Sequence, residues 1–128
     1  MTASGARTIL IIDDDRAVLE TSARMLRDRG FGVVTWSSTL GRLHAMAEAR
    51  PDLVLLDVNM PLVPGDELLA LIKDSPVLRE IPVVLFSSND ETELRRMARK
   101  TGAAGYISKS DLAGDFAGRV AGFLPSGT

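Results

Sequence analysis

The stretch Ile-Leu-Ile-Ile-Asp-Asp-Asp, residues 9–15, changes from four apolar side chains directly to three acidic ones. A short, uninterrupted aliphatic run predicts a strand that is covered on both faces, as in the centre of a parallel sheet. Acidic residues that follow such a strand lie at its carboxyl end, which is the edge where open α/β sheets bind their ligands. This stretch therefore indicates both the class of fold and the place of a site.

Short apolar runs of this kind alternate along the chain with longer segments of helical periodicity. The alternation is typical of βαβ units, so we expect an α/β fold with a doubly wound, five-stranded parallel sheet. The first helix should begin after Asp15 as its N-cap and end at Gly30. The strands are predicted at 8–12, 33–36, 53–56, 83–86 and 105–107, and the later helices at about 39–49, 65–73, between the caps 90 and 102, and at 111–124.

The composition is that of one globular domain. The 128 residues are 45% hydrophobic and 25% charged and contain no internal repeat or linker, so we expect a single domain over 1–128 with its core at about 7–124. No apolar run is long enough for a membrane span and no signal peptide is visible, so we expect a cytoplasmic protein without membrane contact. Fifteen basic residues against 17 acidic ones give a net charge of −2, which does not favour direct nucleic-acid binding.

Polar side chains stand at the ends of four predicted strands. Asp13 and Asp14 follow the first strand and Asp57 follows the third, while Ser87 and Lys109 come after the fourth and fifth. Carboxylates that gather at one sheet edge repel one another, and a bound cation or a raised pKa relieves the repulsion. Two or three aspartates without a histidine or cysteine partner suit a hard divalent cation, above all Mg²⁺. The edge is therefore a predicted magnesium site.

Four runs together resemble the response-regulator receiver domains of two-component phosphorelay systems. They occur in the family's order, at the predicted strand ends, and cover nearly the whole chain. The resemblance implies a flavodoxin-like sheet with strand order 2-1-3-4-5. The runs are residues 9–15, Pro-Asp-Leu-Val-Leu-Leu-Asp-Val-Asn-Met-Pro (51–61), Ile-Pro-Val-Val-Leu-Phe-Ser-Ser (81–88) and Gly-Ala-Ala-Gly-Tyr-Ile-Ser-Lys (102–109).

The resemblance also implies the roles of the acidic residues. Asp57 would be the phosphoacceptor, and Mg²⁺ would be held by Asp14 directly, by Asp13 through water, by Asp57 itself and by the main-chain carbonyl of Asn59. Such a site takes its phosphoryl group from a sensor histidine kinase or a histidine phosphotransfer protein. The domain is then no enzyme in the ordinary sense, because it promotes only its own phosphorylation and dephosphorylation.

Three further residues receive roles from the same resemblance. Ser87 and Lys109 would contact the phosphoryl oxygens, and Ser87 with Tyr106 would form the switch. A hydroxyl that bonds to the phosphoryl group only after phosphorylation makes a contact that differs between the two states, and such a contact can change the affinity for a downstream target. The expected function is therefore that of a phosphorylation-dependent signalling switch.

One departure from the family pattern concerns the residue after Lys109. Receivers usually have proline there, whereas this chain has Ser110. We expect a trans peptide bond, because a cis bond before a residue other than proline costs about 3 kcal/mol. A trans bond would leave the Ser110 side chain free to cap the fifth helix. The departure also leaves open an alternative function, that of a pseudo-receiver, an interaction module that keeps the fold without being phosphorylated.

Two other classes of protein share features with the sequence. A flavin-binding electron carrier has this fold, but it needs a glycine- and hydroxyl-rich phosphate loop after the first strand, where three aspartates stand here. A haloacid-type phosphatase also uses an aspartyl nucleophile, but it places a second aspartate at the position of Asn59. Flavin absorption and turnover of a generic phosphate ester would identify these classes.

The fourth and fifth helices carry the candidate interaction surface. The outward face of the fourth helix carries four basic residues, Arg95, Arg96, Arg99 and Lys100. Such a face is either a solvated surface or a contact surface for a partner. The fifth places glycines at 114, 118 and 122 on its outer side, which weakens a helix unless a partner approaches closely. A homodimer through these two helices is a possible arrangement, with a frayed helix end as the alternative.

Overall fold

The structure is a computed structural model that describes residues 7–37, 43–59, 65–76 and 78–124. Five parallel strands form one sheet in the order β2-β1-β3-β4-β5, as the resemblance to receiver domains implies. Each predicted strand is present, and none differs from its predicted bounds by more than one residue at either end. The strands are β1 (Thr8–Ile12), β2 (Gly32–Trp36), β3 (Leu53–Leu56), β4 (Val83–Ser87) and β5 (Gly105–Ser108).

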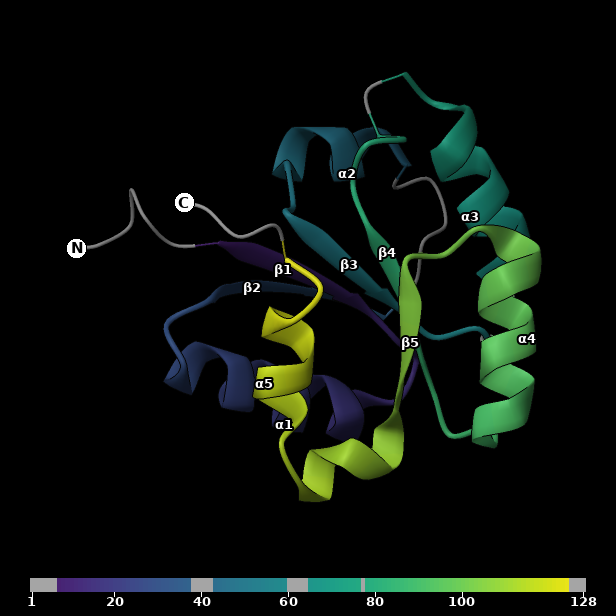
Figure 1. Cartoon of the computed structure of the whole chain (residues 1–128). Coiled ribbons are helices and arrows are strands. Elements are labelled where there is room, and N and C mark those ends of the chain that lie inside the picture. The colour runs from purple at the N-terminus through teal and green to yellow at the C-terminus, as the bar shows by residue number, and fades with distance from the viewer. Residues whose placement is uncertain (1–6, 38–42, 60–64, 77, 125–128) are drawn as a thin grey trace.

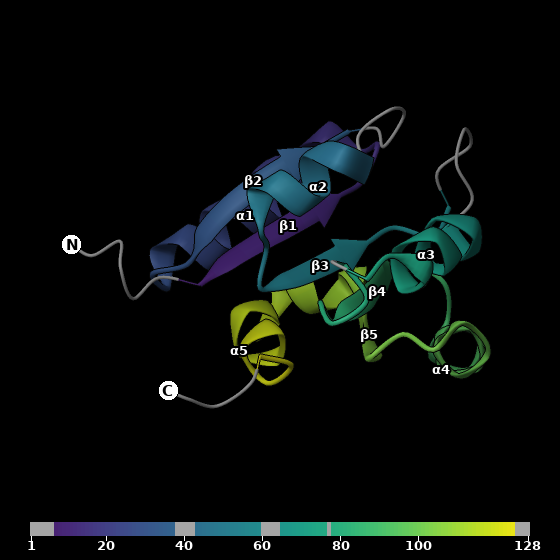
Figure 2. The same cartoon turned by 90° about the horizontal axis from the view of Figure 1, so that it is seen from above.

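Helices cover both faces of the sheet (Figures 1 and 2). One face carries α1 (Arg16–Asp28) and α5 (Phe116–Ala121), and the other carries α2 (Leu43–Ala49), α3 (Gly65–Asp74) and α4 (Glu91–Thr101). The part of the second predicted helix at 39–42 lies outside the described residues. Among the described residues, no helix combines the length and apolar character needed to cross a membrane.

Each central strand contributes to a core on both sides of the sheet. One core lies under α1 and α5 and the other under α2 and α3, while a smaller cluster lies under α4. Ile9–Ile12 and Leu53–Leu56 are fully buried. Because neither face of these strands meets water, their residues do not alternate with polar ones. The uninterrupted aliphatic runs of the sequence follow from this burial.

Both ends of α1 and of α4 have the predicted caps. The Asp15 side chain accepts hydrogen bonds from two backbone N–H groups in the first turn of α1. Gly30 adopts a φ of 93°, and the N–H groups of Gly30 and Phe31 donate to carbonyls of the last turn, which is a Schellman motif. Asp90 caps α4 in the same way as Asp15 caps α1, and Gly102 ends α4 with a φ of 78°.

The prediction of one continuous helix over 111–124 is wrong. The structure has a 3-10 helix, η2 (Lys109–Ala113), and then α5. Gly114 separates them with φ −130° and ψ −130°, a conformation that does not continue a helix. The prediction that Ser110 caps this region is also wrong, because the Ser108 side chain accepts from the N–H of Ser110 and is the cap.

Gly118 has a structural reason within this chain. The Asp115 carboxylate caps α5 by accepting from the Gly118 N–H at 3.2 Å, and a Cβ added at Gly118 would overlap that carboxylate. A bulky residue at this position would therefore displace the cap. The glycine-lined face of α5 is thus explained in part by capping, and the homodimer predicted through it stays untested.

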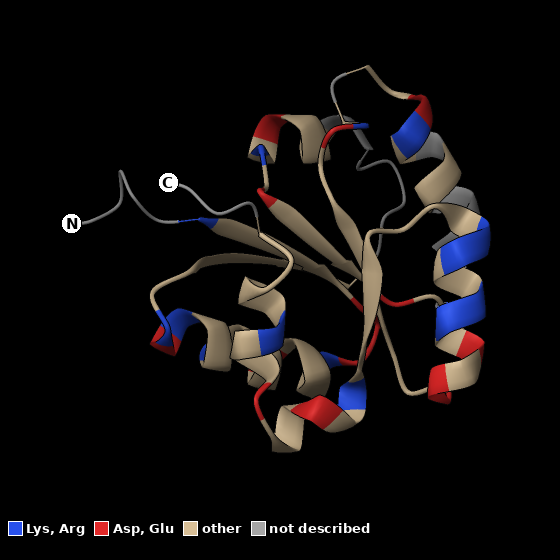
Figure 3. Cartoon of the chain, viewed as in Figure 1, with Lys and Arg blue, Asp and Glu red and all other residues tan. Residues whose placement is uncertain are grey.

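Two of the four basic residues of α4 form ion pairs with acids of the same helix, and Figure 3 shows both kinds of charge along it. Arg95 pairs with Glu91 at 2.9 Å and Arg96 with Glu93 at 3.0 Å. The acids occupy the first turn and the remaining basic residues the last turn, which suits the helix dipole. These local interactions are sufficient to explain the charge pattern of α4.

Candidate functional site: an acidic cluster at the carboxyl edge of the sheet

The sheet itself positions the two buried aspartates. The N–H of Asp13 donates to the Trp36 carbonyl at 3.1 Å, and the N–H of Asp57 donates to the Ile12 carbonyl at 2.9 Å. These bonds extend the pairing of β1 with β2 and of β3 with β1 by one residue beyond each strand. The backbone of both residues is therefore held by neighbouring strands and not by a free loop.

Asp13, Asp14 and Asp57 form a compact acidic cluster. One carboxylate oxygen of each lies within 4.8 Å of the other two. Asp13 is fully buried and Asp57 is 2% exposed, whereas Asp14 faces solvent. Oδ1 of Asp13 accepts from the Asp15 N–H at 2.9 Å, and Oδ1 of Asp57 accepts from the Asn59 N–H at 3.0 Å. The predicted convergence of the three carboxylates is present in the structure.

Lys109 brings the only basic side chain that the described residues place in this cluster. Its Nζ lies 2.7 Å from Oδ2 of Asp13 and 3.6 Å from Oδ2 of Asp57. The ammonium also lies over the Phe86 ring, 5.9 Å from the ring centre. The peptide between Lys109 and Ser110 is trans, as expected without proline. The unusual Ser110 therefore does not keep Lys109 out of the site.

The structure fits a hard divalent cation. Three carboxylates face one ammonium, so the fully ionised cluster has an excess of two negative charges. Oδ2 of Asp13 is buried and makes no hydrogen bond of good geometry, although the Lys109 ammonium lies beside it. A buried carboxylate oxygen without a proper donor is a suitable cation ligand. The backbone of Asn59 lies next to the cluster, because its N–H donates to Asp57.

Burial raises the pKa of the Asp57 carboxyl above its ordinary value of 3.8, and the charges of Asp13 and Asp14 raise it further. The Asn59 N–H and the Lys109 ammonium act in the opposite direction but do not cancel the effect of burial. The folded state therefore holds the ionised form of Asp57 less favourably than the unfolded chain does.

This raised pKa predicts how stability depends on pH. The contribution of Asp57 is fully present below pH 3.8 and is lost as the pH rises through its folded-state pKa, so the ionised carboxylate opposes folding at neutral pH. Without divalent cations, Asp57→Asn should be more stable than the wild type at pH 7, and the difference should shrink as the pH falls. Urea unfolding across this pH range measures the effect, with exposed Asp74→Asn as the control. Equal stabilities at pH 7 would contradict the prediction.

Ser87 lies at the end of β4, where two asparagines bind its hydroxyl. Ser87 is fully buried, and its Oγ accepts from Asn59 Nδ2 at 2.9 Å and donates to Asn89 Oδ1 at 3.0 Å. From the sequence, a role is predicted only for the main chain of Asn59 and none for Asn89. A usable signal was present, because these two residues are the only side-chain amides in the sequence and each stands within three residues of a strand end.

Tyr106 belongs to a different environment from the acidic cluster. It pairs with Leu85 across β5 and β4 and packs with Leu94 and Ala98 under α4. The Tyr106 side chain raises the pKa of the neighbouring Arg95 guanidinium. The two residues of the predicted switch therefore lie in different places: Ser87 is at the site, and Tyr106 packs against α4.

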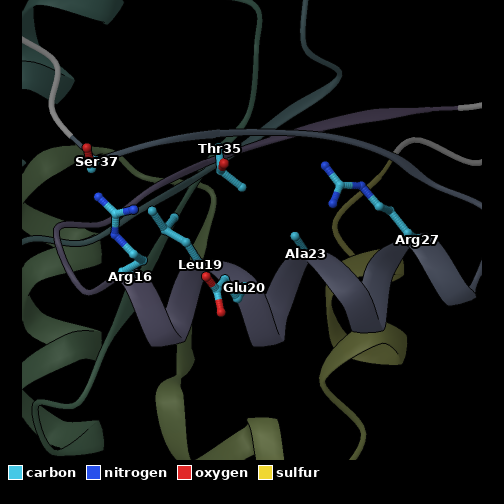
Figure 4. A pocket seen from close by; sticks show the side chains of 7 residues that line it. All are labelled: Arg16, Leu19, Glu20, Ala23, Arg27, Thr35 and Ser37. Atoms are coloured by element: carbon cyan, nitrogen blue, oxygen red, sulfur yellow. The ribbon is translucent and has the colours of Figure 1, made fainter.

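A separate cavity of about 310 Å³ lies between α1 and β2 (Figure 4). Arg16 and Arg27 flank it, with Leu19 and Ala23 between them on the helix and Thr35 on the strand. No member of the acidic cluster lines it. The cavity and the acidic cluster therefore lie in different parts of the molecule, and the function is inferred from the acidic cluster.

Comparison with known proteins identifies the family. The sequence pattern of the response regulator receiver domain matches residues 9–117, and the chain belongs to this family. It is similar to protein PilG of Pseudomonas aeruginosa, with 27% identity over 94% of this chain and 89% of PilG. It spans about half the length of the transcriptional regulators among its curated relatives, 45% to 52% for the PhoB and PrrA proteins.

Solved structures show the same fold. The phosphorylated cyanobacterial phytochrome response regulator RcpA has a TM-score of 0.80 at 26% identity, over 95% of this chain and 100% of that one. The Mn²⁺-bound form of response regulator Rcp1 has a TM-score of 0.78 at 26% identity, over 95% and 97%. The chain is thus a CheY-like receiver domain of the two-component type.

Proposed function

We propose that this receiver domain accepts a phosphoryl group on Asp57 in the presence of Mg²⁺ and thereby changes its affinity for a target protein. The observation that carries the proposal is the position of Asp57, a buried carboxylate between Asp13, Asp14 and the Lys109 ammonium. Two solved structures that share the fold of this chain are described as Mn²⁺-bound and as phosphorylated. This likeness of fold supports the proposal.

Each residue of the cluster has a part in the transfer. An Asp57 carboxylate oxygen forms the new bond to phosphorus, while the bond from phosphorus to the donor's histidine nitrogen, or to the acetate oxygen of acetyl phosphate, breaks. Lys109, 3.6 Å from Asp57, offsets negative charge on the transferred oxygens. Asp13, Asp14, Asp57 and the Asn59 carbonyl would hold Mg²⁺, which supplies Lewis-acid stabilisation of the phosphoryl oxygens.

The partners follow from the same reaction. The phosphodonor would be a sensor histidine kinase or a histidine phosphotransfer protein, and the recipient of the signal a downstream protein. We propose one domain over 1–128, a cytoplasmic location and no direct nucleic-acid contact, in keeping with the net charge of −2. We also propose a homodimer through α4 and α5. Gly118 does not support this dimer, because the Asp115 cap already explains that glycine.

Phosphorylation by a small donor tests the proposal directly. Incubation with acetyl phosphate and Mg²⁺ should add one phosphate per chain by intact-mass analysis, and a chelator should suppress it. Asp57→Asn should abolish the adduct, while Asp52→Asn, which changes an exposed aspartate at the opposite end of β3, should keep it. Absence of any adduct in the wild type would favour the pseudo-receiver, and an adduct that survives in Asp57→Asn would refute the assignment.

A further inference from the structure

The only two side-chain amides of the chain, Asn59 and Asn89, meet at the Ser87 hydroxyl. Asn59 Nδ2 donates to Ser87 Oγ at 2.9 Å and to Asn89 Oδ1 at 2.7 Å. Ser87 Oγ in turn donates to Asn89 Oδ1 at 3.0 Å, which closes a ring of three side chains. The N–H of Asn89 adds a donor to Ser87 Oγ at 3.2 Å.

This ring uses the full hydrogen-bonding capacity of its key atoms. The Ser87 hydroxyl has one hydrogen and two lone pairs, and it donates once and accepts twice. Oδ1 of Asn89 accepts two bonds, and both hydrogens of Asn59 Nδ2 are used. The hydrogen of the Ser87 hydroxyl therefore cannot reach a new acceptor unless its bond to Asn89 breaks.

We infer that Asn89 is a latch that holds the Ser87 hydroxyl away from the phosphoryl group in the unmodified protein. The inference rests on the proposed phosphorylation of Asp57, because only a phosphoryl oxygen at that residue would compete with Asn89 for the hydroxyl hydrogen. Asn59 connects the two sites, since its N–H donates to Asp57 and its amide to Ser87. Asn89 acts as a positioning residue for Ser87. The hydrogen bond between them sets the free energy that is needed to turn the Ser87 hydroxyl toward the phosphoryl group.

The latch also contacts α4, which belongs to the candidate interaction surface. Nδ2 of Asn89 lies 3.9 Å from the sulfur of Met97 on α4, and Met97 packs against the small cluster that contains Leu85, Leu94 and Ala98. When the Ser87 hydroxyl leaves Asn89, the Asn89 amide loses one of the two hydrogen bonds that orient its oxygen, and its contact with Met97 is less firmly held. Release of the latch thus reaches α4 through Asn89 and does not require movement of Tyr106.

Beryllofluoride, an inert analogue of the phosphoryl group, tests the latch. With Mg²⁺ present, Asn89→Ala should bind it about two- to tenfold more tightly than the wild type, because one neutral hydrogen bond no longer has to be broken. In a Ser87→Ala background the same Asn89→Ala change should have no effect, since no hydroxyl remains to be released. Met97→Leu, which removes only the contact with α4, is the matched control and should leave the affinity unchanged.

Nuclear magnetic resonance of the free protein gives a second readout that needs no analogue. The spectrum should contain two carboxamide NH₂ signal pairs, one from each asparagine. The two hydrogens of Asn59 should exchange slowly with water, because both of them are hydrogen-bonded. In Asn89→Ala the single remaining pair should exchange severalfold faster. This measurement also applies if the variant binds no beryllofluoride.

The outcomes separate the latch from the proposed function. If the wild type binds no beryllofluoride and takes no phosphate, the proposed function fails. If the wild type binds it but Asn89→Ala binds equally or more weakly, or if the variant's gain persists without the Ser87 hydroxyl, the latch is refuted. Unchanged exchange of the Asn59 amide in Asn89→Ala would refute the ring itself.

Discussion

Replacing Lys109 with methionine should lower the free energy of unfolding by about 3 kcal/mol in buffer without divalent cations. The Lys109 ammonium is 17% exposed and lies 2.7 Å from the fully buried Asp13 carboxylate. Removing one partner of a buried ion pair leaves an uncompensated charge, which costs about 3–5 kcal/mol. Methionine keeps an unbranched side chain of similar length, so the loss should arise from the charge and not from a cavity.

The measurement is urea denaturation at neutral pH with and without Mg²⁺. Excess Mg²⁺ should restore part of the stability of Lys109→Met, because a ligand that binds only the folded state stabilises it, by about 2.7 kcal/mol at a hundred times its dissociation constant. Lys100→Met, on the exposed surface of α4, should change stability by less than about 0.5 kcal/mol. A Lys109→Met protein as stable as the wild type would show that Lys109 does not compensate the buried aspartates.

Phe116→Ala should be the most damaging core substitution among those that leave the site residues intact. Phe116 is fully buried, and its ring lies 5.2 Å from that of Phe86, in the core under α1 and α5. Truncation of a buried phenylalanine costs about 3–5 kcal/mol, a large fraction of the 5–15 kcal/mol that stabilises a typical domain. The expected result is a clear fall in the midpoint of urea unfolding.

Phe123→Ala provides the comparison. Phe123 is only half-buried and covers Gly105 at the start of β5, so its truncation should cost less than that of Phe116. Both variants leave the acidic cluster unchanged, so phosphorylation of the folded fraction should persist. Equal losses for the two variants would contradict the prediction, because the half-buried Phe123 would then contribute as much stability as the fully buried Phe116.

The strands and the acidic edge were predictable because their signals are local. A strand buried on both faces requires consecutive aliphatic residues, and this requirement alone identifies β1, β3 and β4 within a residue. The convergence of Asp13 and Asp57 then follows from parallel pairing, because each residue comes directly after its strand. The same reasoning places Lys109 near them, although no sequence signal gives its distances of 2.7 and 3.6 Å.

The parts that were not predictable depend on competition between alternatives of similar energy. The region after β5 has helical periodicity in its apolar residues, yet Gly114 breaks it, and Ser108 prevails over Ser110 as the cap because its hydroxyl faces the Ser110 N–H. The role of Asn89 could be found only from side-chain positions, because its hydrogen bonds join two loops, the one after β3 with Asn59 and the one after β4 with Ser87. Sequence spacing does not contain that information.

The strand order has a consequence for the growing chain during translation. β1, β2 and β3 are neighbours in the sheet, and β4 and β5 are then added one after the other to the free edge in the order of their synthesis. A nascent chain that has emerged only as far as β3 therefore already contains Asp13, Asp14 and Asp57, the complete set of carboxylates. The positive charge of Lys109 and the cover from α5 are synthesised only after β5. During folding on the ribosome, the three carboxylates can therefore come together before the lysine that offsets their charge is available.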